Sequence, residues 1–85
     1  MDRTSIEQAI RTFIIDQFLA GHAEELQTNE SLLGTVIDST GILVLVTYLQ
    51  DRFAITVEDD DVVPENIDSV ANLVAYVARK LQNKV

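Results

Sequence analysis

The sequence predicts a small all-α protein, a four-helix bundle of three main helices and one short helix, with a long loop between the first two main helices. Three stretches of the chain repeat apolar residues at the spacing of an amphipathic helix. The 85 residues suffice for one domain, so we treat residues 1–85 as a single unit. The chain has no cysteine, and its 47% hydrophobic residues must therefore build the core by packing alone.

The first helix is predicted over Ser5–Ala20. Thr4 and Glu7 stand three residues apart, which is typical of a capping box at a helix start. Gly21 suits the left-handed conformation that often ends a helix. Between these signals runs one apolar face, formed by Ile6, Ile10, Phe13 and Ile14.

Residues 21–38 lose this period and are predicted to form a long loop. The pattern allows one short helical turn in it, around His22–Gln27. A loop of this length in a small domain is usually functional or anchored by its own apolar side chains. The candidates for anchoring here are Leu26, Leu32, Leu33, Val36 and Ile37.

The second helix is predicted over Ser39–Phe53. The apolar run at residues 42–46 would by itself also suit a buried strand. The apolar spacing continues to Phe53, however, and this length favours a helix. Its core face comprises Ile42, Leu45, Val46, Leu49 and Phe53.

The last third of the chain is predicted to hold a short helical piece and a final helix. The four acidic residues Glu58–Asp61 indicate a solvated loop or the negatively charged start of a short helix. Pro64 ends or redirects that segment. Asp68 or Ser69 then caps the final helix. Its core face is formed by Val70, Leu73, Val74, Val77 and Leu81.

Charge and composition exclude several classes of function. Fourteen acidic residues against six basic ones give a net charge of −8, which repels nucleic-acid phosphates and anionic lipid. We therefore expect no nucleic-acid or membrane partner, and no apolar run approaches the ~20 residues of a membrane span. The charge favours protein partners with basic patches, or it serves only solubility. The lack of cysteine and of an export signal favours a cytoplasmic protein.

Asp38 and Ser39 form an Asp-Ser pair at the start of the second predicted helix. From the residues alone, Ser39 is either a helix cap or the attachment point of a group added from outside. A catalytic or metal-binding site is not favoured, because His22 is the only histidine and no cysteine or spaced ligand set accompanies it. Tyr48 and Tyr76 are expected to be half-buried packing residues rather than proton donors.

Three stretches carry a family resemblance that covers nearly the whole chain. The first is Leu33-Gly34-Thr35-Val36-Ile37-Asp38-Ser39-Thr40. The second is Tyr48-Leu49-Gln50-Asp51-Arg52-Phe53-Ala54-Ile55-Thr56-Val57, and the third is Ile67-Asp68-Ser69-Val70-Ala71-Asn72-Leu73. In this helix order, they resemble the acyl carrier protein family, whose members bear phosphopantetheine.

The resemblance implies that Ser39 receives 4′-phosphopantetheine from coenzyme A, which makes the chain a phosphoprotein. It also implies that Asp38 helps to position the modifying enzyme or its metal ion. Acyl or aminoacyl groups would be held as thioesters on the thiol of the arm, and the carrier itself would not be an enzyme. The second Asp-Ser pair, Asp68-Ser69, is interpreted as a helix cap only.

The resemblance also implies a set of partners. They are a phosphopantetheinyl transferase, an adenylate-forming acyl or aminoacyl ligase, and downstream acyl-transfer or condensing enzymes. Residues 64–69 are similar to those of stand-alone carriers in specialised biosynthetic pathways, which are loaded by a separate ligase. We expect such a carrier to be a monomer.

The exposed side of the second helix departs from the family pattern. Carriers of fatty acid synthesis present acidic residues there, whereas only Asp51 is charged on this face. Leu43 and Val44 either form an apolar patch that binds a partner or pack against neighbouring loops. The alternative function is an unmodified acidic adaptor that binds a protein through this face, and a hydrolase with Ser39 as nucleophile lacks a convincing base. The whole candidate face consists of Thr40, Leu43, Val44, Thr47 and Asp51.

Overall fold

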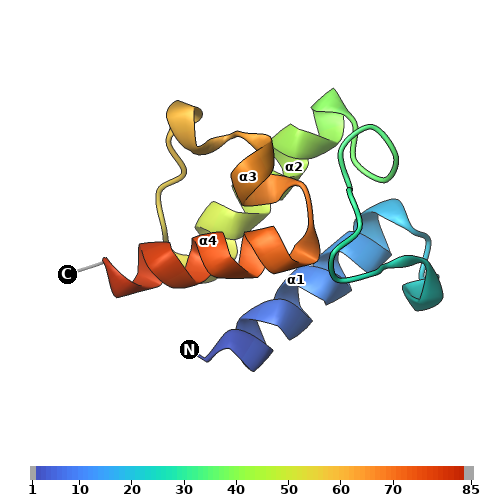
Figure 1. The fold of residues 1–85 in the computed structure, drawn as a ribbon, viewed down its shortest axis with the longest axis horizontal. Coiled ribbons are helices and arrows are strands. Elements are labelled where there is room, and N and C mark those ends of the chain that lie inside the picture. The colour runs from blue at the N-terminus through green and yellow to red at the C-terminus, as the bar shows by residue number, and fades with distance from the viewer. Residues whose placement is uncertain (1, 84–85) are drawn as a thin grey trace.

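The computed structural model describes residues 2–83 and confirms the all-α fold (Figure 1). The elements are, in order, α1 (Arg3–Phe18), a 3-10 turn η1 (Ala23–Glu25), α2 (Ser39–Phe53), a second 3-10 turn η2 (Asp59–Asp61), α3 (Pro64–Ile67) and α4 (Val70–Gln82). Three helices are long and one is short, and the long loop joins α1 to α2. Within residues 2–83, no helix is both long enough and apolar enough to span a membrane.

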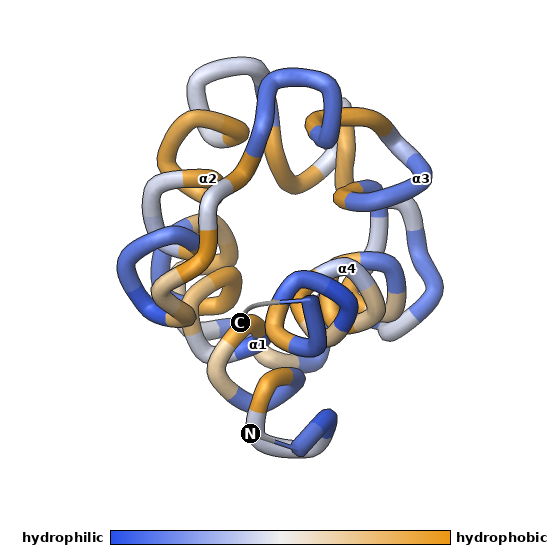
Figure 2. The backbone as a smooth tube through the Cα atoms, turned by 90° about the vertical axis from the view of Figure 1, so that its left-hand side faces the viewer, coloured by the Kyte–Doolittle hydropathy of each residue, from blue (hydrophilic) through white to orange (hydrophobic). Residues whose placement is uncertain are grey.

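One hydrophobic core lies between the helices. The last helix, α4, contacts each of the other three, and its most extensive packing is against α1. Hydrophobic and hydrophilic residues alternate along the helices, as expected where each helix buries one face (Figure 2). The most deeply buried side chains include Ile6, Ile10, Ile14, Leu45, Leu49, Leu73 and Val77.

The helix α1 begins and ends two residues earlier than predicted. Its N-cap is Asp2, whose side chain accepts a hydrogen bond from the Ser5 N–H at 2.8 Å, so the capping box assigned to Thr4 is wrong. The Glu7 carboxylate instead pairs with Arg11 one turn further on. At the other end, Ala20 and Gly21 both have positive φ, which stops the helix.

The loop between α1 and α2 is anchored to the bundle, as its apolar residues predict. Leu26 and Leu32 are buried. The Arg11 guanidinium donates to the Leu26 carbonyl at 3.1 Å and also to the Thr28 hydroxyl. The Thr28 carbonyl in turn accepts from the Ala71 N–H of α4 at 3.0 Å. The first half of the loop is therefore tied to both α1 and α4, and the helical turn in it is shorter than the His22–Gln27 prediction.

The helix α2 has the predicted bounds, but its buried face is shifted slightly. Leu45, Leu49 and Phe53 are buried as expected, whereas Ile42 and Val46 are only half-buried. The remaining buried position of this face is Gly41.

The acidic run before α3 is partly anchored rather than simply solvated. The Tyr76 hydroxyl donates to the Asp61 carboxylate at 2.8 Å, and the Lys80 ammonium lies 3.5 Å from the same oxygen. The hydrogen bond from Tyr76 lowers the pKa of Asp61. Tyr76 is only 2% exposed, so it is more deeply buried than predicted. Burial, and to a lesser extent the hydrogen bond to Asp61, raises the pKa of Tyr76. A tyrosine with a raised pKa does not suit the role of a proton donor near neutral pH.

Candidate functional site

Ser39 lies at the first position of α2 and is exposed to solvent. It does not cap the helix, because that position belongs to Asp38. The Asp38 carboxylate accepts a hydrogen bond from the Gly41 N–H at 2.8 Å, and the Asp38 carbonyl accepts from the Ile42 N–H at 2.9 Å. The interpretation of Ser39 as the helix cap is therefore wrong, and the Ser39 hydroxyl is not needed to cap α2.

Gly41 sets how closely this helix start packs on the end of α1. A Cβ atom built on Gly41 would lie 2.9 Å from Cε1 of Phe18 and 3.0 Å from Cγ2 of Ile37. Any larger residue would force these side chains apart. Sequence reasoning missed this role, although a glycine in the first turn of an apolar helix is a signal that could have pointed to a close contact.

The surroundings of Ser39 fit a phosphodiester. The first turn of α2 contains no acidic side chain, and the Asp38 carboxylate beside it is directed at the Gly41 N–H. The N-terminus of a 15-residue helix carries partial positive charge and unpaired N–H groups, which favour a negatively charged group. Ser39 would carry the phosphopantetheine, and its arm would supply the thiol that a cysteine-free chain lacks.

The predicted partner face lies on the exposed side of α2. The side chain of Leu43 is 69% exposed and that of Val44 is 40% exposed, so packing against neighbouring loops does not account for them. The Thr47 hydroxyl donates to the Leu43 carbonyl at 2.9 Å, which satisfies it within the helix. Thr40 and Asp51 are also exposed. The face is therefore an apolar patch with polar neighbours, the form that protein interfaces often take.

This face continues onto α1, which the sequence did not reveal. Leu43, Val44, Thr47 and Asp51 line an open depression of about 450 Å³ together with Tyr48, Phe13 and Gln17. Thr40 does not line it. The depression therefore adds two α1 residues, Phe13 and Gln17, to the candidate face on α2.

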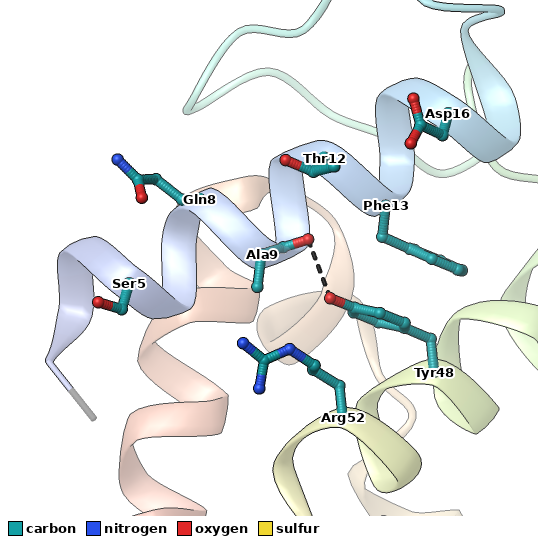
Figure 3. A pocket seen from close by; sticks show the side chains of 8 residues that line it. All are labelled: Ser5, Gln8, Ala9, Thr12, Phe13, Asp16, Tyr48 and Arg52. Atoms are coloured by element: carbon teal, nitrogen blue, oxygen red, sulfur yellow. Dashed lines mark hydrogen bonds between the residues drawn. The ribbon is translucent and has the colours of Figure 1, made fainter.

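Phe13 and Tyr48 line both this depression and a second one, which Figure 3 shows. The ring centroids of Phe13 and Tyr48 lie 4.0 Å apart, and the ring planes are stacked at an angle of 12°. The Tyr48 hydroxyl donates a hydrogen bond to the Ala9 carbonyl at 3.0 Å. Tyr48 is half-buried, and this burial raises its pKa, in agreement with a packing role. The second depression, of about 610 Å³, is lined by both polar and apolar side chains, with Asp16 and Arg52 among its charged ones.

The remaining candidate residues form no site with Ser39. His22 is exposed, and its Nδ1 lies 3.3 Å from the Glu24 carboxylate. The part of the chain that the structure describes contains no cluster of three or more side chains suited to hold a metal ion.

No protein-family model matches the chain, and no solved structure matches it at a significant level. The functional interpretation therefore depends on the residues and geometry described above.

Proposed function

We propose that this chain is a carrier protein that holds acyl or aminoacyl groups as thioesters on a 4′-phosphopantetheine arm attached to Ser39. One observation carries the proposal: Ser39 is exposed at the start of α2 while Asp38 forms the helix cap. The four-helix fold with its long anchored loop is also what the resemblance to acyl carrier proteins leads one to expect. The carrier performs no catalysis itself.

The arm would raise the effective concentration of cargo at a docked enzyme, to the millimolar range for a short flexible link. The enzymes concerned are a phosphopantetheinyl transferase, which takes the arm from coenzyme A, an adenylate-forming ligase, and downstream acyl-transfer or condensing enzymes. Asp38 would help to position the transferase or its metal ion through its exposed side. We place this activity in the cytoplasm, in a specialised biosynthetic pathway, and propose that the carrier acts as a monomer.

The test is covalent modification of the purified chain. We would incubate it with coenzyme A and a broad-specificity phosphopantetheinyl transferase and record its intact mass. The expected gain equals one phosphopantetheine group in the parent and in Ser69→Ala, which retains Ser39, and is absent in Ser39→Ala. No gain in the parent, with the transferase active on a known carrier, would overturn the proposal.

We further propose that the apolar patch around Leu43 and Val44 is the surface that the ligase reads. A glutamate at position 44 would place a charge in a surface that becomes desolvated on binding. We expect Val44→Glu, already carrying the arm, to be loaded at least ~10-fold more slowly by the cognate ligase. The matched control is Thr56→Glu, which adds the same charge at an exposed position that does not line the depression. Equal loading rates for Val44→Glu and the parent would remove this part of the proposal.

The exposed patch also favours one alternative, an unmodified acidic adaptor. Leu43 and Val44 would then bind a partner with no prosthetic group involved. The two functions separate in the native host: a carrier is recovered with phosphopantetheine on Ser39, whereas an adaptor is recovered with a bare hydroxyl there.

A further inference from the structure

The second Asp-Ser pair does more than cap a helix. Ser69 is the N-cap of α4, and its hydroxyl accepts a hydrogen bond from the Asn72 N–H at 3.0 Å. Asp68 takes no part in that cap. Its Oδ1 accepts from the Ser31 hydroxyl at 2.8 Å, from the Leu33 N–H at 3.0 Å and from the Leu32 N–H at 3.2 Å. The Asp68 carbonyl also accepts from the Leu32 N–H, at 2.6 Å.

Asp68 thus holds one end of a compact turn formed by residues 31–37, which we call the pre-helix turn. The Leu32 carbonyl accepts from the N–H groups of Val36 and Ile37, both at 2.9 Å, and the Ile37 carbonyl accepts from the Gly34 N–H at 3.0 Å. Leu32 and Ile37 are each 1% exposed. Because the turn is closed by its own hydrogen bonds and anchored in the core at both ends, fixing its start also fixes its end.

The end of the pre-helix turn leads directly to the attachment site. Ile37 is followed by the cap residue Asp38 and then by Ser39. Ile37 also lies against Gly41 in the first turn of α2, where Cγ2 of Ile37 would be 3.0 Å from an added Cβ. A displacement of the turn would therefore displace the start of α2 and the hydroxyl that it presents.

We propose that Asp68 is a positioning residue for Ser39: it clamps the pre-helix turn and so holds the Ser39 hydroxyl where a modifying enzyme reaches it. The inference rests on the carrier function proposed above. Hydrogen bonds to a charged acceptor are stronger than those between neutral groups, so a carboxylate is well suited to this clamp. The same bonds, that from the Leu33 N–H most of all, lower the pKa of Asp68 below its ordinary value. A reacting group that is misplaced by even ~1 Å reacts more slowly.

The experiment compares Asp68→Ala with Asp68→Asn and Ser69→Ala. Asparagine keeps an acceptor oxygen and should rescue most of the effect, whereas Ser69→Ala weakens the same chain junction without touching the pre-helix turn. All variants are studied at a temperature at which circular dichroism shows them folded. The first readout is hydrogen exchange of the Leu32, Leu33 and Ile37 amides. The second is kcat/KM for modification of Ser39 by the transferase.

We expect Asp68→Ala to exchange these amides at least ~10-fold faster and to lower kcat/KM by about 10-fold, the scale of losing hydrogen bonds to a charged acceptor. Asp68→Asn should stay within about threefold of the parent in both readouts, and Ser69→Ala should match the parent in both. If Asp68→Ala does not fold, Ser31→Ala replaces it, with a smaller loss expected because one of three donors is removed. Parent-like modification of the folded alanine variant, or an equal loss in Ser69→Ala, overturns the positioning role.

The two proposals fail in different ways. If the parent is never modified, the carrier function falls and the positioning role falls with it, while amide exchange still reports whether Asp68 holds the pre-helix turn. If the parent and Asp68→Ala are modified equally well, the carrier function stands and only the positioning role is lost.

Discussion

Asp38 and Ser39 divide two tasks that the start of a helix often gives to one side chain. Asp38 satisfies the backbone by accepting from the Gly41 N–H, and it does so from an extended backbone conformation typical of an N-cap. Ser39 follows at the first helical position with its side chain in solvent. A modification of Ser39 would therefore leave the cap in place.

This division predicts unequal costs for two neighbouring substitutions. Asp38→Ala should lower the free energy of unfolding by about 1 kcal/mol, the usual effect of losing an N-cap. Ser39→Ala should change it by less than about 0.5 kcal/mol, as for an ordinary exposed position. Urea denaturation of the three proteins at pH 7 measures both values. If Ser39→Ala lowered the free energy of unfolding as much as Asp38→Ala does, the Ser39 side chain would also contribute to capping the helix.

At the scale of elements, the close packing of α2 on the end of α1 requires a glycine at position 41. Gly41 is buried in the first turn of α2, where Phe18 near the end of α1 and Ile37 in the pre-helix turn approach it. The aromatic side chain of Phe18 also meets Phe13 edge-on, with ring centres 6.0 Å apart. The contact at Gly41 thus links the pre-helix turn, α2 and the aromatic residues of α1.

Gly41→Ala should destabilise the protein, although alanine favours a helix more than glycine does. The gain in helix propensity is about 1 kcal/mol, whereas forcing a methyl group into a filled space costs about 1–3 kcal/mol. We expect a net loss of about 1 kcal/mol in the free energy of unfolding, measured by urea denaturation. Thr40→Ala, at the exposed neighbouring position, is the control and should stay within about 0.5 kcal/mol of the parent. A more stable Gly41→Ala would show that Phe18 and Ile37 move aside freely.

The elements that the sequence predicted correctly are those with local signals. The bounds of α2 were predicted from the Asp-Ser pair at its start, an apolar spacing that continues to Phe53 and a change of pattern after that residue. The start of α1 was misplaced because Asp2, Thr4 and Ser5 are all good caps, and the choice among them depends on which backbone groups the rest of the bundle leaves unpaired.

The interactions that sequence reasoning missed join residues far apart in the chain. Asp68 accepts hydrogen bonds from Ser31 and Leu33, which precede it by 37 and 35 positions, and the Tyr48 ring stacks on Phe13 of another helix. In the sequence, Asp68 looks like an ordinary helix cap and Tyr48 like an ordinary core residue. The candidate face was therefore predicted on α2 alone, and its extension onto α1 emerged only from the packed structure.

At the scale of the whole molecule, the acidic side chains differ in burial: Glu7, Asp61 and Asp68 are half-buried and the others are exposed. The exposed ones contribute mainly to the net charge of −8. Asp61 and Asp68 each connect α4 or its start to a segment distant in sequence. The pKa of each is lowered, in Asp61 chiefly by the hydrogen bond from Tyr76 and in Asp68 chiefly by that from the Leu33 N–H.

Acid should therefore destabilise the fold through these two residues. Both have a folded pKa below the ordinary value of 3.8, so their contribution is complete above that pH and is lost as the pH falls through the folded values. We expect each to contribute roughly 1 kcal/mol, allowing for solvent screening. The measurement is urea denaturation from pH 7 down to pH 2 in about 1 M NaCl, where repulsion among the exposed carboxylates is screened. Asp68→Asn and Tyr76→Phe should each flatten the loss of stability in acid, whereas Asp60→Asn, an exposed change in the same acidic run, should leave the curve parallel to that of the parent. If the stability of the parent is constant over this range, protonation of Asp61 and Asp68 does not destabilise the folded state. Neither carboxylate's hydrogen bonds would then stabilise the fold.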